Sequence, residues 1–262
     1  MRYLLAIYVD ESRLEGLSPE ESKRVLEEYE ALSREWAGGG VMVAGDGLDP
    51  SSTATTVRIR RGERLISDGP FAESKEQLGG FYVIDCDDLD EAIELAARIH
   101  AARWGAVEVR PVMNYEELGA EPPVWRSEAR ARKYMLTLWG DESAWESWSP
   151  EELQENMKLW ERYDREATAA GVMLGGEGLE PSNTAKTVRV RAGERLINDG
   201  PFAETKEQLG GFYLLECKNL DHAIEWAAKV PVPDEEPVEI RPVMDYAAAA
   251  GEKAPPPAEA RS

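Results

Sequence analysis

A fifteen-residue phrase occurs twice in this chain of 262 residues, and the duplication constrains the fold more than any other feature. The phrase reads DGPFAESKEQLGGFY from Asp68 and DGPFAETKEQLGGFY from Asp199, an offset of 131 residues. The same offset relates VEVRPVMNY from Val107 to VEIRPVMDY from Val238 and holds along nearly the whole chain. The chain therefore consists of two copies of one unit, which we expect to fold in the same way.

The two copies divide the chain into four segments. We place the first repeat at residues 1–118 and the second repeat at residues 133–246. Residues 119–132 between them are rich in proline and arginine and are expected to form a linker. Residues 247–262 read AAAAGEKAPPPAEARS, a composition typical of a disordered tail.

Each repeat has the pattern of strand, helix, strand, hairpin, strand, helix and strand. The clearest helix begins at Ser18, because Ser18 is a good N-cap, Pro19 suits the first helical position and Glu21 completes a capping box. The hairpin is expected to turn at Arg61-Gly62. In the first repeat, the other elements are expected to be RYLLAIYV from Arg2, VMVAGDGL from Val41, GGFYVIDC from Gly79, a helix capped by Asp88, and VEVRPVMN from Val107.

Without the hairpin, this order is β-α-β-β-α-β, the ferredoxin-like arrangement of an α+β protein. One such unit has an antiparallel sheet with helices on one face, and the other face must be solvated or buried on a partner. The second repeat is available as that partner. We therefore predict two tandem ferredoxin-like units that stack as a pseudo-dimer within one chain, like a dimeric α/β barrel.

The DGPF phrase, the capped helix after it and the closing VEVRP resemble the YCII-related family, and specifically its DGPF-domain branch. The resemblance covers both repeats. It implies a ferredoxin-like fold of the dimeric α/β-barrel class and no settled reaction, and some members are encoded beside extracytoplasmic-function sigma factors. Small YCII-like proteins resemble enzymes with a proposed His-Asp pair. Here His100 aligns with Pro231 and His222 with Glu91, so that mechanism does not carry over.

The charge and composition exclude several classes of protein. The formal net charge of −21 disfavours binding to nucleic acid, which needs a basic surface. No run of residues approaches a membrane span, so a soluble cytoplasmic protein is expected. The two cysteines and two histidines do not form a metal-binding pattern, and no phosphate loop or dinucleotide fingerprint occurs, so we expect no metal and no cofactor.

The DGPF segment differs from the rest of the repeat in how little its two copies have diverged. From Arg58 to Tyr82, 21 of 25 positions are identical in the two repeats, against 5 of 17 in the first helix. A structural interpretation makes Asp-Gly-Pro a turn and uses Phe71 to fix the loop on the core. A functional interpretation takes the carboxylates and the lysine of the loop as binding or proton-transferring groups at the end of a sheet.

The last strand supplies a second set of candidates. Glu108 and Arg110 are two residues apart and share one face of the strand, and Glu239 and Arg241 repeat them. These charges either form structural ion pairs where the repeats meet or line a polar cavity there. Asp10-Glu11, repeated as Asp141-Glu142, ends the first strand and is a weaker candidate.

Two functions fit these features. The first is binding of a small, anionic molecule with cofactor-independent acid–base activity, in which Asp68 and Asp199 transfer protons. The ligand-binding residues would then be Glu73, Lys75, Glu108 and Arg110 in the first repeat, and Glu204, Lys206, Glu239 and Arg241 in the second. The second is a non-catalytic regulatory module that contacts a protein partner, in keeping with the sigma-factor context of the family.

Overall fold

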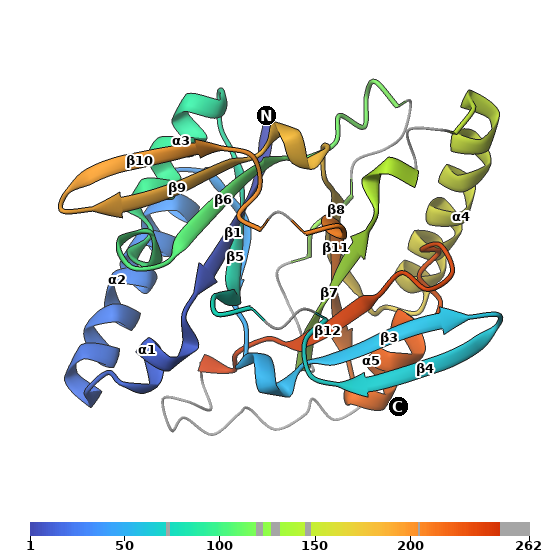
Figure 1. Ribbon diagram of the computed structural model, residues 1–262, viewed down its shortest axis with the longest axis horizontal. Coiled ribbons are helices and arrows are strands. Elements are labelled where there is room, and N and C mark those ends of the chain that lie inside the picture. Colours follow the sequence, from blue (N-terminus) through green and yellow to red (C-terminus); the bar gives the residue numbers. More distant parts are fainter. Residues whose placement is uncertain (72–73, 119–122, 127–131, 145–147, 204, 247–262) are drawn as a thin grey trace, which may run out of the picture.

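The computed structural model of the chain is an α+β fold with two six-stranded antiparallel sheets (Figure 1). The structure describes residues 1–71, 74–118, 123–126, 132–144, 148–203 and 205–246. The first repeat contains β1 (Arg2–Val9), α1 (Glu11–Glu15), α2 (Pro19–Gly38), β2 (Met42–Gly47), η1 (Ser51–Thr53), β3 (Thr55–Arg60), β4 (Glu63–Asp68), β5 (Gln77–Asp85), α3 (Leu89–Arg98), η2 (His100–Arg103) and β6 (Ala106–Pro111). The second contains β7 (Arg132–Gly140), η3 (Glu142–Ala144), α4 (Pro150–Ala169), β8 (Met173–Gly178), η4 (Ser182–Thr184), β9 (Lys186–Arg191), β10 (Glu194–Asp199), β11 (Gln208–Cys217), α5 (Leu220–Ala227) and β12 (Val238–Pro242).

The helices begin where their capping residues predict. Ser18 caps α2 in a complete capping box with Glu21, and Pro19 is its first residue. Asp88 accepts a hydrogen bond from the N–H of Glu91 and caps α3. These local signals satisfy N–H groups that the first turn of a helix leaves free, which is why they fix helix starts reliably. The short α1 was not predicted from the sequence.

The hairpin of each repeat belongs to the sheet of the other repeat. One sheet has the order β10-β9-β6-β1-β5-β2, and the other has the order β4-β3-β12-β7-β11-β8. In Figure 1 the orange β9–β10 hairpin lies beside the blue and green strands, and the cyan β3–β4 hairpin lies beside the red β12. The predicted hairpins are present, but their exchange between the repeats is not predicted by the sequence pattern.

The exchanged pairing is short and well defined. Val107 of β6 lies opposite Val188 of β9, and Val238 of β12 lies opposite Val57 of β3. Each hairpin turns at the predicted place, with positive φ at both central residues, 53° at Arg61 and 78° at Gly62. Positive φ at two successive residues matches the twist of a two-residue hairpin.

Three hydrophobic clusters hold the molecule together. The first lies between one sheet and helices α2 and α3, where Leu32, Trp36 and Ile93 are buried. The second is its counterpart in the other repeat, around Tyr163 and Trp226. Helices therefore cover the outer face of each sheet, as Figure 1 shows on its two sides.

The third cluster lies between the two sheets and joins the repeats. It contains Leu4 and Phe81 of the first repeat and Met135 and Phe212 of the second, and the rings of Phe81 and Phe212 lie 5.3 Å apart. Both repeats thus bury the sheet face that their helices leave open, against each other. Because the sheets pack in this way, polar side chains of one repeat lie close to loops of the other repeat.

The segments outside the repeats are described only in part. Within the predicted linker, the N–H of Arg126 donates to the carbonyl of Leu174 at 2.8 Å, so residues 123–126 run beside β8. Arg132 is the first residue of β7. The other linker residues, 119–122 and 127–131, lie outside the described residues, as does the predicted disordered tail 247–262. None of the described helices combines the length and the apolar character of a membrane span.

Candidate functional site

Two open depressions occupy equivalent places in the two repeats. The first-repeat depression has a volume of about 370 Å³, and the second-repeat depression has a volume of about 670 Å³. Six residues of one lining correspond to six of the other at the offset of 131. They are Ser51, Ser52, Pro70, Ser74, Lys75 and Gln77 in the first depression, and Ser182, Asn183, Pro201, Thr205, Lys206 and Gln208 in the second.

The DGP turn forms one wall of each depression. It follows β4 in the first repeat, where the N–H of Gly69 donates to the carbonyl of Ala54 at 2.8 Å and the carbonyl of Gly69 accepts from the hydroxyl of Thr56 at 3.0 Å. Gly69 has a φ of 97° and its equivalent Gly200 has a φ of 94°. An L-residue rarely adopts this conformation, so the turn requires glycine at both places.

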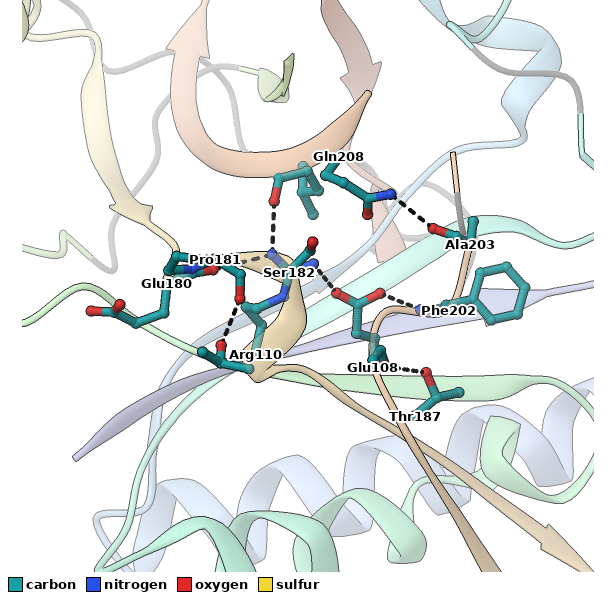
Figure 2. A network of polar contacts seen from close by, with 12 residues as sticks. Glu108, Arg110, Glu180, Pro181, Ser182, Thr187, Phe202, Ala203 and Gln208 are labelled. Carbon is teal, nitrogen blue, oxygen red and sulfur yellow. Dashed lines mark hydrogen bonds and ion pairs between the residues drawn. The ribbon is translucent and has the colours of Figure 1, made fainter. Parts of the chain in front are cut away.

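Figure 2 shows a buried ion pair of the first repeat, Glu108 and Arg110, near Ser182 and Gln208, which line the second-repeat depression. Nη2 of Arg110 donates to Oε1 of Glu108 at 2.6 Å, and both side chains are almost inaccessible to solvent. The other oxygen of Glu108 accepts from the N–H of Phe202 in the second DGPF loop at 2.8 Å. Nη1 of Arg110 donates to the carbonyls of Glu180 and Leu209, each at 3.2 Å.

The second repeat supplies the same ion pair to the first-repeat depression. Nη1 of Arg241 donates to Oε1 of Glu239 at 3.3 Å, and Oε2 of Glu239 accepts from the N–H of Phe71 at 2.8 Å. Nη2 of Arg241 donates to the carbonyl of Asp49 at 2.6 Å. Each last strand stays in the sheet of its own repeat, and its glutamate holds the DGPF loop of the other repeat.

The phenylalanine of each DGPF loop adds an apolar contact to this link. Phe202 stacks on Tyr8 of the first repeat with ring centroids 4.2 Å apart, and Phe71 lies 5.6 Å from Trp139 of the second. The guanidinium groups of Arg189 and Arg58 each lie 5.4 Å from the ring of the nearby phenylalanine. Aromatic and cation–π contacts of this kind add stability beyond the area they bury.

Glutamates that follow the first strand lie beside the depressions: Glu11 lines the first, and Glu142 is hydrogen-bonded to Ser182, which lines the second. Glu11 accepts hydrogen bonds from the N–H and the hydroxyl of Ser51, at 2.7 Å and 2.6 Å. Glu142 accepts the equivalent bonds from Ser182 at 2.8 Å and 2.6 Å. The sequence pattern makes these glutamates weak candidates and does not single out the serines, although Ser51 and Ser182 follow the repeated Leu-Asp/Glu-Pro motif that signals a fixed turn.

The lysines lie at the rim of the depressions. Nζ of Lys75 is 3.5 Å from Asp10, and Nζ of Lys206 is 3.4 Å from Asp141, while both lysine side chains are more than three quarters exposed. Hydrogen bonds from Ser12 hold the pKa of Asp10 below its usual value, with Lys75 acting in the same direction. Ser143 and Lys206 have the same effect on the pKa of Asp141. The rim is therefore zwitterionic at neutral pH.

The predicted proton-transferring aspartates lie at the surface. Asp68 ends β4 and is exposed, and the side chain of Asp199 is 89% exposed at the end of β10. Lys186 donates to Asp199 at 2.6 Å and lowers the pKa of this carboxyl, whereas Thr55 stands at the equivalent place beside Asp68. The predicted ligand-binding residues Glu73 and Glu204 lie outside the described residues.

Buried carboxylates with raised pKa values occur away from the depressions. Glu177 of β8 accepts from Arg2 at 3.0 Å and from the indole of Trp125 at 2.9 Å. Its equivalent Asp46 pairs with Lys133, so both contacts join one repeat to the other. Burial raises the pKa of both carboxyl groups, and the neighbouring cations oppose this effect.

Glu236 distinguishes the two repeats. It is half-buried beside Gly140 and Asp141, and burial raises its pKa to about 7. The equivalent position in the first repeat is Gly105, so no carboxyl corresponds to it there. No sequence pattern points to this group, because its surroundings come from a turn of the same repeat that is distant along the chain.

Neither cysteine is among the described residues that line the depressions. Cys86 and Cys217 are free and buried, and burial raises the pKa of the two thiols to about 11 and about 12. Thiols in this state are poor nucleophiles at neutral pH. No group of three or more residues suited to hold a metal ion occurs within the part of the chain that the structure describes.

The comparisons with known proteins agree with the duplicated architecture. The YCII-related domain matches residues 1–116 and again residues 133–247. The chain belongs to the YCII-related family. A relative described as "Uncharacterized protein R00369", from Rhizobium meliloti (strain 1021), is 42% identical over 118 residues. These residues are 44% of this chain and 95% of that protein. The matched length is therefore about that of one repeat of this YCII-related chain.

The solved structures offer a more distant likeness. A crystal structure described as "Putative Chlorite dismutase TA0507" aligns with 95% of the YCII-related chain, over 97% of its own length. The two share 10% sequence identity, and the TM-score is 0.45. A likeness at this level carries no argument about the site or the activity.

Proposed function

We propose that this YCII-related protein binds a small polar molecule in each of its two depressions. The observation that carries this proposal is the recurrence of the same lining, with a serine, a proline, a lysine and a glutamine at equivalent places in both repeats. Volumes of about 370 and 670 Å³ fall within the range of ligand sites. The hydroxyl, carboxylate and ammonium groups at the surface suit a polar ligand.

The ion pairs near the depressions support this function by positioning their walls. Arg110 and Arg241 are buried and already bonded to glutamates and carbonyls, so we assign them and Glu108 and Glu239 a positioning role. Lys75 and Lys206 are exposed at the rim, and we assign them the contact with an anionic group of the ligand. Glu73 and Glu204 remain candidates on the sequence alone.

We further propose acid–base activity, in which Asp68 and Asp199 transfer protons. Asp68 and Asp199 stand at the end of the strand that leads into the DGP turn, where they can reach a ligand held by the loop. Lys186 lowers the pKa of Asp199 below its ordinary acidic value, so this carboxylate, ionised at neutral pH in any case, would act as a weak base. No cofactor or metal enters this scheme.

The test is a thermal-shift screen against metabolites. It compares the wild type with a Lys75→Ala/Lys206→Ala variant and with a Lys23→Ala/Lys158→Ala control, which removes two exposed helical lysines of the same charge. A ligand at one hundred times its Kd should raise Tm by about 5 °C. A ligand that stabilises the wild type and the control but not the rim variant supports the proposal. A ligand that raises the Tm of all three proteins equally would show that its site lies elsewhere.

The acid–base part has its own variant. Asp68→Asn/Asp199→Asn should bind the ligand found in the screen and lose its turnover, since these aspartates are exposed and carry little of the fold. Unchanged turnover in this variant would remove both aspartates from the reaction.

Contact with a protein partner is the second candidate function. The hairpin edges favour it, because β4 and β10 are exposed along their whole length and carry Leu65, Ile66, Leu196 and Ile197, each about half exposed. Open strand edges pair readily with another chain. A pull-down that depends on these four residues supports this function, and one that is insensitive to Leu65→Ser/Leu196→Ser argues against it.

The finer classification is also a proposal. The element order without the exchanged hairpin is β-α-β-β-α-β in each repeat, which supports ferredoxin-like units stacked as a pseudo-dimer of the α/β-barrel type. The repeated DGPF phrase supports the DGPF-domain branch of the family. We likewise propose repeat limits of 1–118 and 133–246 and a cytoplasmic location.

A further inference from the structure

The carboxylate of Glu11 lies where three kinds of donor converge at the wall of the first-repeat depression. Its Oε1 accepts from the backbone N–H of Ser51 at 2.7 Å and lies 3.7 Å from Nη2 of Arg241. Its Oε2 accepts from the hydroxyl of Ser51 at 2.6 Å. Backbone N–H groups, hydroxyls and guanidinium groups are the donors with which proteins hold carboxylates and phosphates.

The second repeat builds the same arrangement. Oε1 of Glu142 accepts from the N–H of Ser182 at 2.8 Å and lies 3.9 Å from Nη1 of Arg110, and Oε2 accepts from the hydroxyl of Ser182 at 2.6 Å. The residues that follow Glu11 and Glu142 have diverged strongly between the repeats. The donor set is thus formed twice, each time from a serine of one repeat and a buried arginine of the other.

The glutamates are accessible, whereas the arginines are not. The side chains of Glu11 and Glu142 are 26% and 30% exposed, and those of Arg241 and Arg110 are 0% and 1% exposed. The helix that Glu11 begins has no buried residue, so this side chain can turn outward without disturbing the core. Arg241 would keep its bonds to Glu239 and to the Asp49 carbonyl, and the donor set would persist.

We propose that each depression is a site for a small oxyanion or carboxylate group, and that Glu11 and Glu142 occupy its donors in the unliganded protein. An entering anion displaces the glutamate, takes its bonds from Ser51 or Ser182, and lies near the rim lysine. This inference rests on the proposed function and names its ligand class. The internal carboxylate competes with the ligand, so the wild type binds more weakly than a protein without it.

The experiment removes the competing carboxylates and measures anion binding directly. Thermal shift is recorded for the wild type, for Glu11→Ala/Glu142→Ala and for Glu15→Ala/Glu151→Ala, a control that removes two exposed carboxylates of the same charge. Inorganic phosphate and acetate are titrated against sodium chloride at constant ionic strength, because this acidic protein responds to salt in general. Hydrogen exchange then locates the effect at the amides of Ser51 and Ser182.

We expect the Tm of the Glu11→Ala/Glu142→Ala protein to rise by about 5 °C at saturating phosphate or acetate. The wild type and the control should need at least ten-fold more anion for the same rise. Equal responses in all three proteins, or no response with the fold intact, would overturn the inference. If the double variant does not fold, the single variants each leave one repeat unaltered and are read in the same way.

The two proposals fail separately. A metabolite that needs Lys75 and Lys206 but binds the wild type and the Glu11→Ala/Glu142→Ala protein equally would support the proposed function and contradict this inference. Phosphate binding to the Glu11→Ala/Glu142→Ala protein, without any metabolite hit on the wild type, would support the anion site and leave the proposed function without its ligand.

Discussion

At the scale of single residues, the buried pair of Glu108 and Arg110 shows how one repeat stabilises the other. The carboxylate of Glu108 neutralises Arg110 and also accepts the N–H of Phe202, which belongs to the opposite repeat. A buried charge without its partner retains its full desolvation cost. Removing one partner of this buried pair is therefore expected to lower the free energy of unfolding.

We predict that Glu108→Ala lowers the free energy of unfolding by about 3–5 kcal/mol, because it leaves the guanidinium of Arg110 buried without its hydrogen-bonded carboxylate. Replacing both partners, as Glu108→Leu/Arg110→Met, should cost less than the single change. Urea denaturation measures both values. A single variant that loses under 1 kcal/mol would show that the pair contributes little.

Glu236 gives a prediction about pH. Burial raises its pKa to about 7 from 4.5, so the folded protein retains a proton that the unfolded chain has released between these pH values. The free energy of unfolding therefore falls as pH rises through this window. The full shift corresponds to about 3 kcal/mol, and solvent screening of this half-buried group reduces it to about 1 kcal/mol.

Glu236→Gln should consequently stabilise the protein by about 1 kcal/mol at pH 8 and by nothing at pH 4, relative to the wild type. Thermal denaturation across pH 4–8 measures this difference. The Glu235→Gln variant is the matched control, because Glu235 is exposed and its pairing with Arg60 is at the surface. An equal effect of Glu236→Gln at both pH values would contradict the raised pKa.

At the scale of elements, local signals explain what the sequence could predict. Ser18, Pro19 and Glu21 fix the start of α2 through contacts within one turn, and Arg61-Gly62 fixes the hairpin turn. The partner of the hairpin depends on contacts between residues far apart in the chain, such as Val57 with Val238. Both repeats have nearly identical hairpins and last strands, so sequence alone cannot distinguish pairing within a repeat from exchange.

Engineered disulfides distinguish the two pairings. Val107 and Val188 lie directly opposite each other in an antiparallel pair, within the range of Cα separations that a disulfide spans. With Cys86 and Cys217 replaced by alanine, Val107→Cys/Val188→Cys should form an intrachain disulfide, measured by mass spectrometry of the digest. The control Val57→Cys/Val107→Cys would cross-link only if each hairpin stayed in its own sheet.

At the scale of the whole molecule, the repeat predicted two copies packed through their open sheet faces, and the inter-sheet cluster around Phe81 and Phe212 shows that packing. The candidate site was predicted only in part. The DGP turn and Lys75 could be found because they are repeated motifs. The approach of Arg241 to Glu11 of the other repeat could not be found, since it follows from the packing of the two repeats.

The same packing makes a prediction for the first repeat expressed alone, as residues 1–118. Its inter-sheet face, with Leu4 and Phe81, would be exposed, and Glu108 would lose the N–H that Phe202 donates. A second copy can supply both, because Phe71 of that copy is equivalent to Phe202. We therefore expect a homodimer with exchanged hairpins, measured by light scattering after size exclusion. The Phe71→Ala variant should weaken this dimer, and a stable folded monomer would show that a single repeat is self-sufficient.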